Sequence, residues 1–156
     1  MGAGMIELDF ETEIKAQAER VFDLLFDLRD YDRWLPPSAA FHGTTTISEG
    51  PIAVGTTYVE PGPLGTRHGV VTEAVRSTRL AFEQPMTLKP KLFGVIGIKL
   101  SHTLEPLGAS VRLRRSLRLS PQGPVRLVMP MVVRMFRSEN ERMMRTLKAY
   151  AEANPG

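Results

Sequence analysis

The apolar residues at the end of the chain recur mostly at three- and four-residue steps, which is the period of one face of an α-helix. The pattern predicts a helix over residues 125–152, about 40 Å long at roughly 1.5 Å per residue. Pro124 stands where a helix start accepts proline, whereas Pro130 is expected to kink or loosen the first turns. The apolar positions are Val125, Val128, Met129, Val132, Met135, Phe136, Met143, Leu147 and Tyr150.

The rest of the chain is dominated by the alternation that is typical of β-strands. Residues 6–14 alternate apolar and mostly acidic side chains, which predicts a first strand with one wet face. An amphipathic helix over residues 18–28 follows, and a second short helix at 31–35 ends before two prolines. Six more segments, separated by glycine and proline turns, are expected to be strands. They are residues 42–49, 56–60, 67–75, 79–83, 95–105 and 110–120.

The long helix needs a large apolar surface to cover it, and one face of an antiparallel sheet is the natural partner. The order of elements therefore predicts an α+β fold, in which a seven-stranded antiparallel sheet wraps around the C-terminal helix and two short helices follow strand 1. The chain has no linker and no internal repeat, so a single domain over residues 1–156 is expected. A helix gripped by a curved sheet encloses an interior that can hold a small molecule.

Composition excludes several classes of site. The chain has no cysteine, so it carries no disulfide, thiol nucleophile or cysteine-ligated metal. Its longest apolar runs are far too short for a membrane span, so stable membrane insertion is not expected. The Met-Gly-Ala-Gly start lacks the basic region and apolar core of a secretory signal, which indicates a cytoplasmic protein.

The net charge of +3 is unevenly distributed, because acids prevail over residues 7–32 and bases over residues 112–148. Two interpretations are open. The arginines form solvated faces that keep the protein soluble, or they form a basic surface that meets anionic lipid or nucleic acid. The basic residues lack interleaved exposed aromatics, so no nucleic-acid partner is expected. Both a monomer and a dimer are compatible with the sequence.

Two polar residues interrupt the apolar sides of the last two predicted strands. His102 shares the strand face of Ile98 and Leu100, and Arg115 shares the face of Leu113. If the connecting turn falls at residues 107–108, the two side chains are near cross-strand neighbours within reach of one ligand group.

A buried arginine is costly unless it is paired, so Arg115 requires an acidic neighbour, a ligand anion or an outlet to water. Glu73 and Glu83 are possible protein partners. Two interpretations remain open at this point. Either Arg115 forms a structural ion pair near the rim of the sheet and His102 is a hydrogen-bonded core residue, or both residues face a ligand.

No metal and no cofactor are expected. The three histidines, His42, His68 and His102, lack the helical spacing and the acidic cluster of a metal site. The sequence contains no nucleophile elbow, phosphate-binding loop or dinucleotide fingerprint. Tyr31 and Trp34 precede the first long loop, where an aromatic side chain either gates a cavity mouth or plugs the space under the loop.

Several short motifs carry a resemblance to a known family. Residues 18–25 read AERVFDLL and residues 31–36 read YDRWLP; VGT, VTE and RLAF follow at 54–56, 71–73 and 79–82, and NER at 140–142 precedes LK at 147–148. In these motifs the chain resembles the START-like, helix-grip (SRPBCC) superfamily, and within it the bacterial polyketide cyclase/dehydrase-like proteins. The resemblance covers essentially the whole chain. It implies a cavity between sheet and C-terminal helix for hydrophobic molecules such as lipids, sterols, quinones or polyketides.

Such a cavity leads to two functional hypotheses. The first is the binding of a hydrophobic small molecule, such as a lipid, polyketide or quinone, by one or two polar anchors. The alternative is a polyketide cyclase, aromatase or dehydratase, in which Arg115 orients a carbonyl and His102 or Tyr58 moves protons. The residues expected to line the cavity are Trp34, Tyr58, Ile98, Leu100, His102, Leu113, Arg115, Leu117, Met129, Val132 and Phe136.

Overall fold

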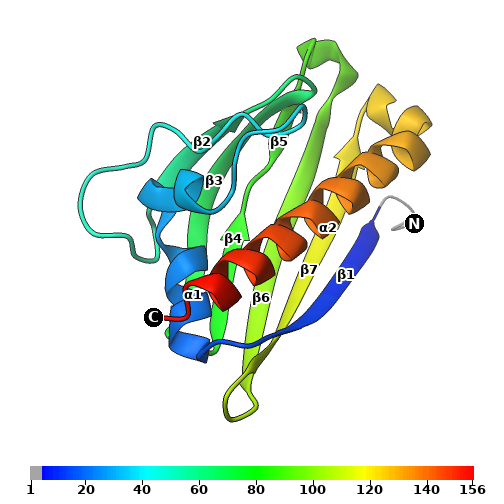
Figure 1. Cartoon of the computed structure of the whole chain (residues 1–156). Helices are drawn as coiled ribbons and strands as arrows, with labels where there is room; N and C mark the ends of the chain where they lie inside the picture. The colour runs from blue at the N-terminus through cyan, green and yellow to red at the C-terminus, as the bar shows by residue number, and fades with distance from the viewer. Residues whose placement is uncertain (1–4) are drawn as a thin grey trace.

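The computed structural model describes residues 5–156 and confirms the predicted fold, an antiparallel sheet of seven strands with one long helix across its concave side (Figure 1). The main strand order is β1-β7-β6-β4-β3-β2, and β5 pairs with β3 and β6. The strands are β1 (Ile6–Ile14), β2 (Thr57–Pro61), β3 (Gly65–Val75), β4 (Arg79–Glu83), β5 (Met86–Leu88), β6 (Val95–Pro106) and β7 (Val111–Gln122). The α-helices are α1 (Ala18–Phe26) and α2 (Met129–Ala153), and the 3-10 turns are η1 (Leu28–Arg33), η2 (Lys91–Phe93) and η3 (Pro124–Val128).

The Met-Gly-Ala-Gly start, on which the expected absence of a secretory signal rests, lies outside the described residues. Among residues 5–156, none of the helices combines the length and the hydropathy that crossing a bilayer requires.

The β6–β7 hairpin is the longest pairing in the sheet. Its strands pair from Val95 opposite Gln122 to Pro106 opposite Val111, and the predicted turn lies between them. On its other edge, β7 pairs with β1. Successive side chains of β7 therefore point alternately toward α2 and toward solvent.

The solvent-facing side of β7 is an arginine ladder paired with the acids of β1. Arg114 Nε lies 3.0 Å from a carboxylate oxygen of Glu11, and Arg118 Nε lies 2.9 Å from one of Glu7. All four of these side chains are more than half exposed. This part of the basic C-terminal segment fits the interpretation of a solvated arginine face.

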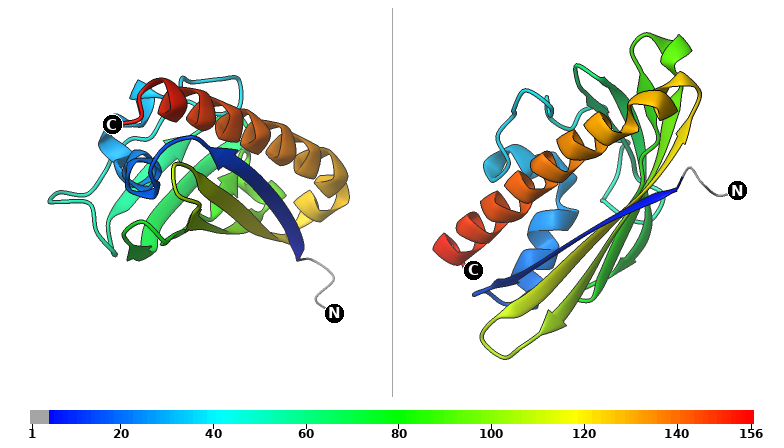
Figure 2. Two further views of the ribbon diagram at one scale, coloured as in Figure 1. Left: turned by 60° about the horizontal axis from the view of Figure 1, so that its bottom comes forward. Right: turned by 90° about the vertical axis from the view of Figure 1, so that its right-hand side faces the viewer.

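Helix α2 crosses the concave side of the sheet obliquely, and its C-terminal end lies near α1 (Figure 2). The helical run breaks at Val128, so that η3 precedes α2 and Pro130 lies in the first turn of α2. The expected disturbance near Pro130 therefore takes the form of a break just before it. Farther along, Leu147 is fully buried, and burial of one leucine side chain contributes about 1.5–3 kcal/mol.

One predicted strand is wrong and is replaced by another. Residues 42–49 form no strand, and only Thr45 makes an isolated bridge, to Val59 of β2. Thr46 has a φ of 50° and Gly43 a φ of 100°, so the chain turns where a strand would have to stay extended. The seventh strand is β5, three residues inside a proline-containing stretch between the strands predicted at 79–83 and 95–105.

The second short helix also differs in detail from the prediction. It is the 3-10 turn η1, which begins earlier than expected and contains a non-helical residue at Asp30. Trp34 follows it, is 3 % exposed, and donates its indole N–H to the Leu24 carbonyl of α1 at 3.1 Å. Because Tyr31 packs edge-on against Trp34, the two aromatics fix the segment that follows α1.

Candidate ligand-binding pocket

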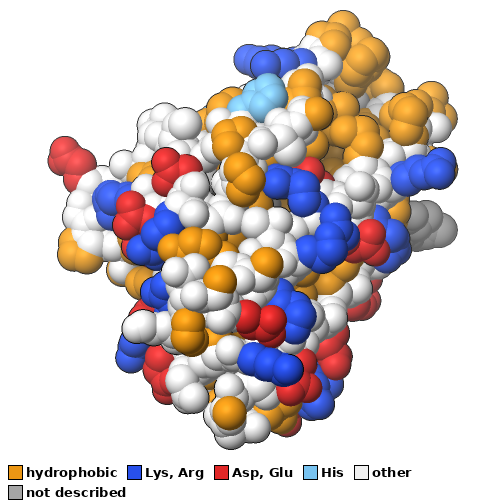
Figure 3. Space-filling model, viewed as in Figure 1, with side chains coloured by type: hydrophobic (Ala, Val, Ile, Leu, Met, Phe, Trp, Pro, Cys, Tyr) orange, Lys and Arg blue, Asp and Glu red, His pale blue; other side chains and the backbone are white. Residues whose placement is uncertain are grey.

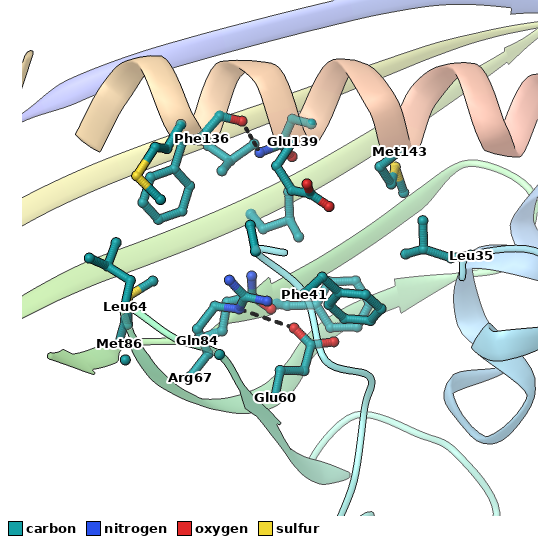
Figure 4. A pocket seen from close by; sticks show the side chains of 18 of the residues that line it. Leu35, Phe41, Glu60, Leu64, Arg67, Gln84, Met86, Phe136, Glu139 and Met143 are labelled. Atoms are coloured by element: carbon teal, nitrogen blue, oxygen red, sulfur yellow. Dashed lines mark hydrogen bonds and ion pairs between the residues drawn. The ribbon is translucent and has the colours of Figure 1, made fainter. Parts of the chain in front are cut away.

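A pocket lies between α2, the sheet and the loop that follows η1 (Figure 4). Its volume is about 100 Å³, which is room for several water molecules at roughly 10–15 Å³ each. The apolar lining includes Leu35, Phe41, Phe82, Leu100, Leu117, Met135, Phe136 and Met143. The polar lining includes Tyr58, Glu60, Arg67, Gln84, Arg115, Glu139 and Asn140.

Strand register brings Arg115 into this pocket. Arg115 lies directly opposite His102, and Leu117 lies opposite Leu100, which also lines the pocket. The predicted cross-strand proximity of His102 and Arg115 is therefore confirmed. The two residues differ in access, because the Arg115 side chain reaches the pocket while His102 lies behind it and is 1 % exposed.

Arg115 is held in place by two neutral side chains. Its Nε donates to Asn140 Oδ1 at 2.7 Å, and its Nη1 donates to His102 Nε2 at 2.7 Å. Asn140 is itself oriented, because its Nδ2 donates to the Phe136 carbonyl one turn earlier in α2 at 2.7 Å. The arginine thus ties strand β7 both to β6 and to the helix.

The hydrogen bonds of His102 determine its protonation. Nδ1 lies 3.2 Å from the Leu80 carbonyl, which only accepts, so Nδ1 carries the proton. Nε2 is then free to accept from Arg115. Burial, and secondarily the positive charge of Arg115, lower the pKa of His102 well below its ordinary value. The imidazole is therefore neutral at pH 7, with both nitrogens engaged.

Arg115 has no carboxylate partner among the described residues, although such a partner was one of the two interpretations of the sequence. Glu73 instead pairs with Arg79 at 3.0 Å on the surface, and Glu83 is exposed. Burial lowers the pKa of Arg115 to about 10, so the guanidinium remains a cation at neutral pH. The positive charge is therefore offset only by neutral hydrogen-bond partners and by more distant groups.

The guanidinium of Arg115 also has hydrogen-bond donors that the protein does not use. A guanidinium carries five N–H groups, and the bonds to Asn140 and His102 use two of them. Nη2 of Arg115 has no hydrogen-bond partner among the described residues, and no fully enclosed side-chain nitrogen or oxygen of these residues lacks one, so Nη2 is not sealed in protein. Since Arg115 lines the pocket, the two N–H groups of Nη2 are open to whatever occupies it.

Two carboxylates also line the pocket, and both already have partners. Glu60, 7 % exposed, accepts from Arg67 Nε at 3.2 Å and from the Thr44 hydroxyl at 2.7 Å. Glu139 pairs with Arg142 at 2.6 Å, and the Ser38 hydroxyl lies 3.2 Å from both of its oxygens. Arg115 is therefore the one charged group of the described lining without a charged partner at close range.

Tyr58 reaches the pocket because its cross-strand partner is a glycine. A Cβ atom at Gly69 would lie 2.1 Å from the Tyr58 ring, so only glycine allows the ring to lie flat over β3. The hydroxyl donates to Gln84 Oε1 at 2.6 Å, and burial raises the pKa of Tyr58 above its ordinary value.

The residues expected to line the cavity lie in different places. Five line the pocket: Tyr58, Leu100, Arg115, Leu117 and Phe136. His102 lies behind Arg115, and four others are buried elsewhere in the core: Ile98, Leu113, Met129 and Val132. Trp34 lies behind η1, against a shallow depression beside the end of α2.

Sequence reasoning missed Glu60, Gln84 and Asn140, although each interrupts an apolar pattern. Glu60 shares its strand face with Tyr58, and Gln84 continues the buried face of β4. Asn140 lies four residues after Phe136 in the apolar stripe of α2. A polar residue in phase with buried ones was the available signal, as it was for Arg115.

No group of three or more metal-binding side chains occurs within residues 5–156.

Comparison with known families identifies the domain. Residues 5–152 match the family described as polyketide cyclase / dehydrase and lipid transport. The chain belongs to this family. No curated protein sequence matches it. The family, whose description includes lipid transport, indicates a domain that binds hydrophobic ligands.

Solved structures of similar fold share little sequence with the chain. One is norcoclaurine synthase from Thalictrum flavum in complex with dopamine and hydroxybenzaldehyde, at 14% identity and a TM-score of 0.73, with 99% of this chain and 92% of that chain covered. A START superfamily protein from Mycobacterium smegmatis has 16% identity and a TM-score of 0.69, with 94% and 97% covered. At these identities the likeness concerns the fold.

Proposed function

We propose that the protein binds an amphipathic small molecule whose hydrophobic body fills the pocket and whose carboxylate or carbonyl oxygen accepts hydrogen bonds from Arg115. The observation that carries this proposal is the cationic guanidinium in the pocket lining, which has no carboxylate partner among the described residues and has N–H groups to spare. A buried charge is costly when it is left unpaired. An anionic or carbonyl oxygen from a ligand supplies the missing partner.

The surroundings of Arg115 favour this type of ligand. Leu100, Leu117 and Phe136 provide an apolar wall around the polar group. Glu60 and Glu139 are already paired, so they compete little for the guanidinium. Hydrogen bonds to a charged group contribute about 1.5–3 kcal/mol, which corresponds to roughly ten- to a hundredfold in affinity.

Binding fits the geometry better than catalysis by the groups considered above. A cyclase or dehydratase mechanism requires a proton donor or acceptor beside the substrate. Both nitrogens of His102 are engaged, and His102 does not line the pocket. The Tyr58 hydroxyl donates to Gln84, and burial disfavours its ionised form.

The proposal is tested by titrating the protein with decanoate and with decanol in a calorimeter. The two probes share a chain length and differ in the group that would meet Arg115. Arg115→Met should weaken decanoate binding by about ten- to a hundredfold and leave decanol binding nearly unchanged. The matched control is Arg114→Met, one residue away on the solvent side of β7, which should bind both probes as the wild type does. Equal decanoate affinity in Arg115→Met and wild type, or no decanoate binding by the wild type, contradicts the proposal.

A further inference from the structure

Large hydrophobic side chains are exposed together at the end of the molecule where η2 and η3 lie. Of the ten large hydrophobic side chains exposed among the described residues, half belong to this apolar patch. Leu127 is 86 % exposed and Leu92 is 72 % exposed. Figure 3 shows hydrophobic side chains gathered over this end of the molecule, with lysine and arginine side chains at the edge. The apolar patch consists of Leu92, Phe93, Leu127, Val128 and Met131.

Two glycines hold the halves of the apolar patch together. Gly94 follows η2 and Gly123 precedes η3, and a Cβ atom built on Gly123 would lie 3.2 Å from the Gly94 Cα atom. A Cβ atom on Gly94 would lie 1.9 Å from the Gln122 carbonyl oxygen, so the close approach requires glycine there. Both glycines have a positive φ, 110° and 92°. The patch is therefore a defined surface rather than two unrelated loops.

The apolar patch has a basic rim. Lys89 precedes η2, Lys91 is its first residue, Arg126 lies in η3, and Arg134 lies one turn beyond Met131 in α2; all four are exposed. The two stretches of sequence that carry the patch, residues 84–104 and 106–138, contain no aspartate or glutamate. A surface that is apolar at its centre and carries exposed basic side chains at its edge matches the interface of a bilayer with anionic headgroups.

We propose that the apolar patch docks on the surface of an anionic phospholipid bilayer. A second copy of the chain suits the patch less well, because a two-fold symmetric contact would place the patch against itself and bring the two sets of basic side chains together. The docking is peripheral, since Leu92 and Leu127 would enter only the headgroup region and its boundary with the acyl chains.

The apolar patch is continuous with the mouth of the pocket, and this link rests on the function proposed above. Met135 lies one turn after Met131 in α2, is exposed, and also lines the pocket. In the close view, Leu64 and Met86 lie across from Phe136 toward the N-terminal half of α2, the end that leads to the patch (Figure 4). A hydrophobic ligand that leaves the bilayer beside Met131 thus passes Met135 into the pocket without crossing open water.

The test is co-flotation of the protein with vesicles of phosphatidylcholine and with vesicles of an equal mixture of phosphatidylcholine and phosphatidylglycerol. The wild type should float with the anionic vesicles and little with the neutral ones, and added salt should release it. Leu127→Glu should weaken binding to the anionic vesicles by roughly tenfold or more. The matched control is Val54→Glu, because Val54 is also exposed but lies outside the patch. For the rim, Lys91→Glu should weaken binding severalfold, whereas Lys99→Glu, an exposed lysine on β6, should not.

Several outcomes overturn the docking proposal. These are a wild type that stays unbound with anionic vesicles, a Leu127→Glu variant that binds them as well as Val54→Glu does, and a dimer in sedimentation that Leu127→Glu disperses. Failure here is separable from failure of the pocket proposal. Leu127→Glu should keep the wild-type affinity for decanoate without vesicles, and Arg115→Met should still float. Loss of decanoate binding in Leu127→Glu would mean that the patch belongs to the pocket and does not dock on membranes.

Discussion

The two faces of strand β7 place arginine side chains in contrasting environments. On the solvent side, Arg112, Arg114 and Arg118 each meet a carboxylate, and water reaches both partners. On the side facing α2, Arg115 stands between buried leucines and is held by a histidine and an asparagine. Strand β7 therefore carries arginine both in exposed ion pairs and at a partly buried site without a carboxylate, where the loss of hydration costs free energy.

The difference between these environments distinguishes surface arginines, whose ion pairs contribute little to stability, from Arg115, whose partly buried charge lacks a carboxylate partner. An exposed ion pair contributes about 0–1 kcal/mol, so the outer ladder serves mainly solubility. A half-buried guanidinium without a carboxylate loses hydration and recovers only part of it from neutral partners. The inner arginine is therefore the better candidate for a role in binding.

The largest difference between the two sides should appear when apolar packing is removed. Leu113 is fully buried on the inner face, next to the solvent-facing Arg114. Leu113→Ala should lower the free energy of unfolding by about 2–5 kcal/mol, because it removes buried methyl groups and leaves a cavity. Arg114→Ala, the matched control, should lower it by less than about 1 kcal/mol. Urea unfolding measures both, and equal losses would contradict the assigned faces of β7.

A second effect concerns the helix side of the Arg115 network. Asn140→Leu removes the acceptor of Arg115 Nε and should cost about 1–3 kcal/mol in unfolding free energy, because a donor in a buried setting loses its partner. In the double variant with Arg115→Met the donor is gone as well, so the two losses should not add, with a coupling of about 0.5–3 kcal/mol.

Asn154→Leu is the matched control for Asn140→Leu. Asn154 makes the same kind of bond to the carbonyl four residues earlier, at 3.0 Å, but it is exposed at the end of α2. Its replacement should change stability by no more than about 0.5 kcal/mol. Additive losses for Asn140→Leu and Arg115→Met would show that the Asn140–Arg115 hydrogen bond contributes little to stability.

A third effect is a dependence of stability on pH through His102. Burial lowers the folded-state pKa of His102, so below about pH 6.5 the unfolded chain binds a proton that the folded chain does not. Stability should therefore fall as the pH drops below about 6.5, by up to about 1.4 kcal/mol per pH unit from this residue. His102→Gln should flatten that slope, because it removes the group whose pKa burial lowers. Identical slopes for wild type and His102→Gln, in melts between neutral and mildly acidic pH, would contradict the assigned burial effect.

Periodicity was enough to predict most of the fold. Alternation located β1 and the β6–β7 hairpin, and the helical period located α2 almost to its ends. It failed at residues 42–49, where threonines suit a strand but Thr46 and Gly43 adopt positive φ values that no alternation reveals. The short strand β5 was missed because three residues between prolines carry too little pattern.

The candidate site was less predictable, because a pocket depends on which parts of a buried face are left uncovered. The strand period placed Arg115 and His102 on the apolar sides of their strands, and a turn at residues 107–108 made them near cross-strand neighbours. Which of the two reaches the pocket depends on the packing of α2, and Asn140 supplies a hydrogen bond to Arg115 across elements 25 residues apart. Leu113 and Leu117 have the same phase in β7, yet only Leu117 lines the pocket.

The smallest effect on stability is expected for the exposed arginines on the solvent side of β7. Arg114 is 60 % exposed, and its partner Glu11 also lies 3.4 Å from Arg112, so the carboxylate keeps a cation when Arg114 is replaced. Arg114→Gln should therefore lower the free energy of unfolding by about 0–1 kcal/mol at low salt. The loss should shrink further at high salt, because screening over a Debye length of about 10 Å at 0.1 M already weakens exposed pairs. Urea unfolding at two salt concentrations measures this difference. A loss of several kcal/mol that persists at high salt would mean that the ladder stabilises the sheet, and that exposure does not separate the two kinds of arginine.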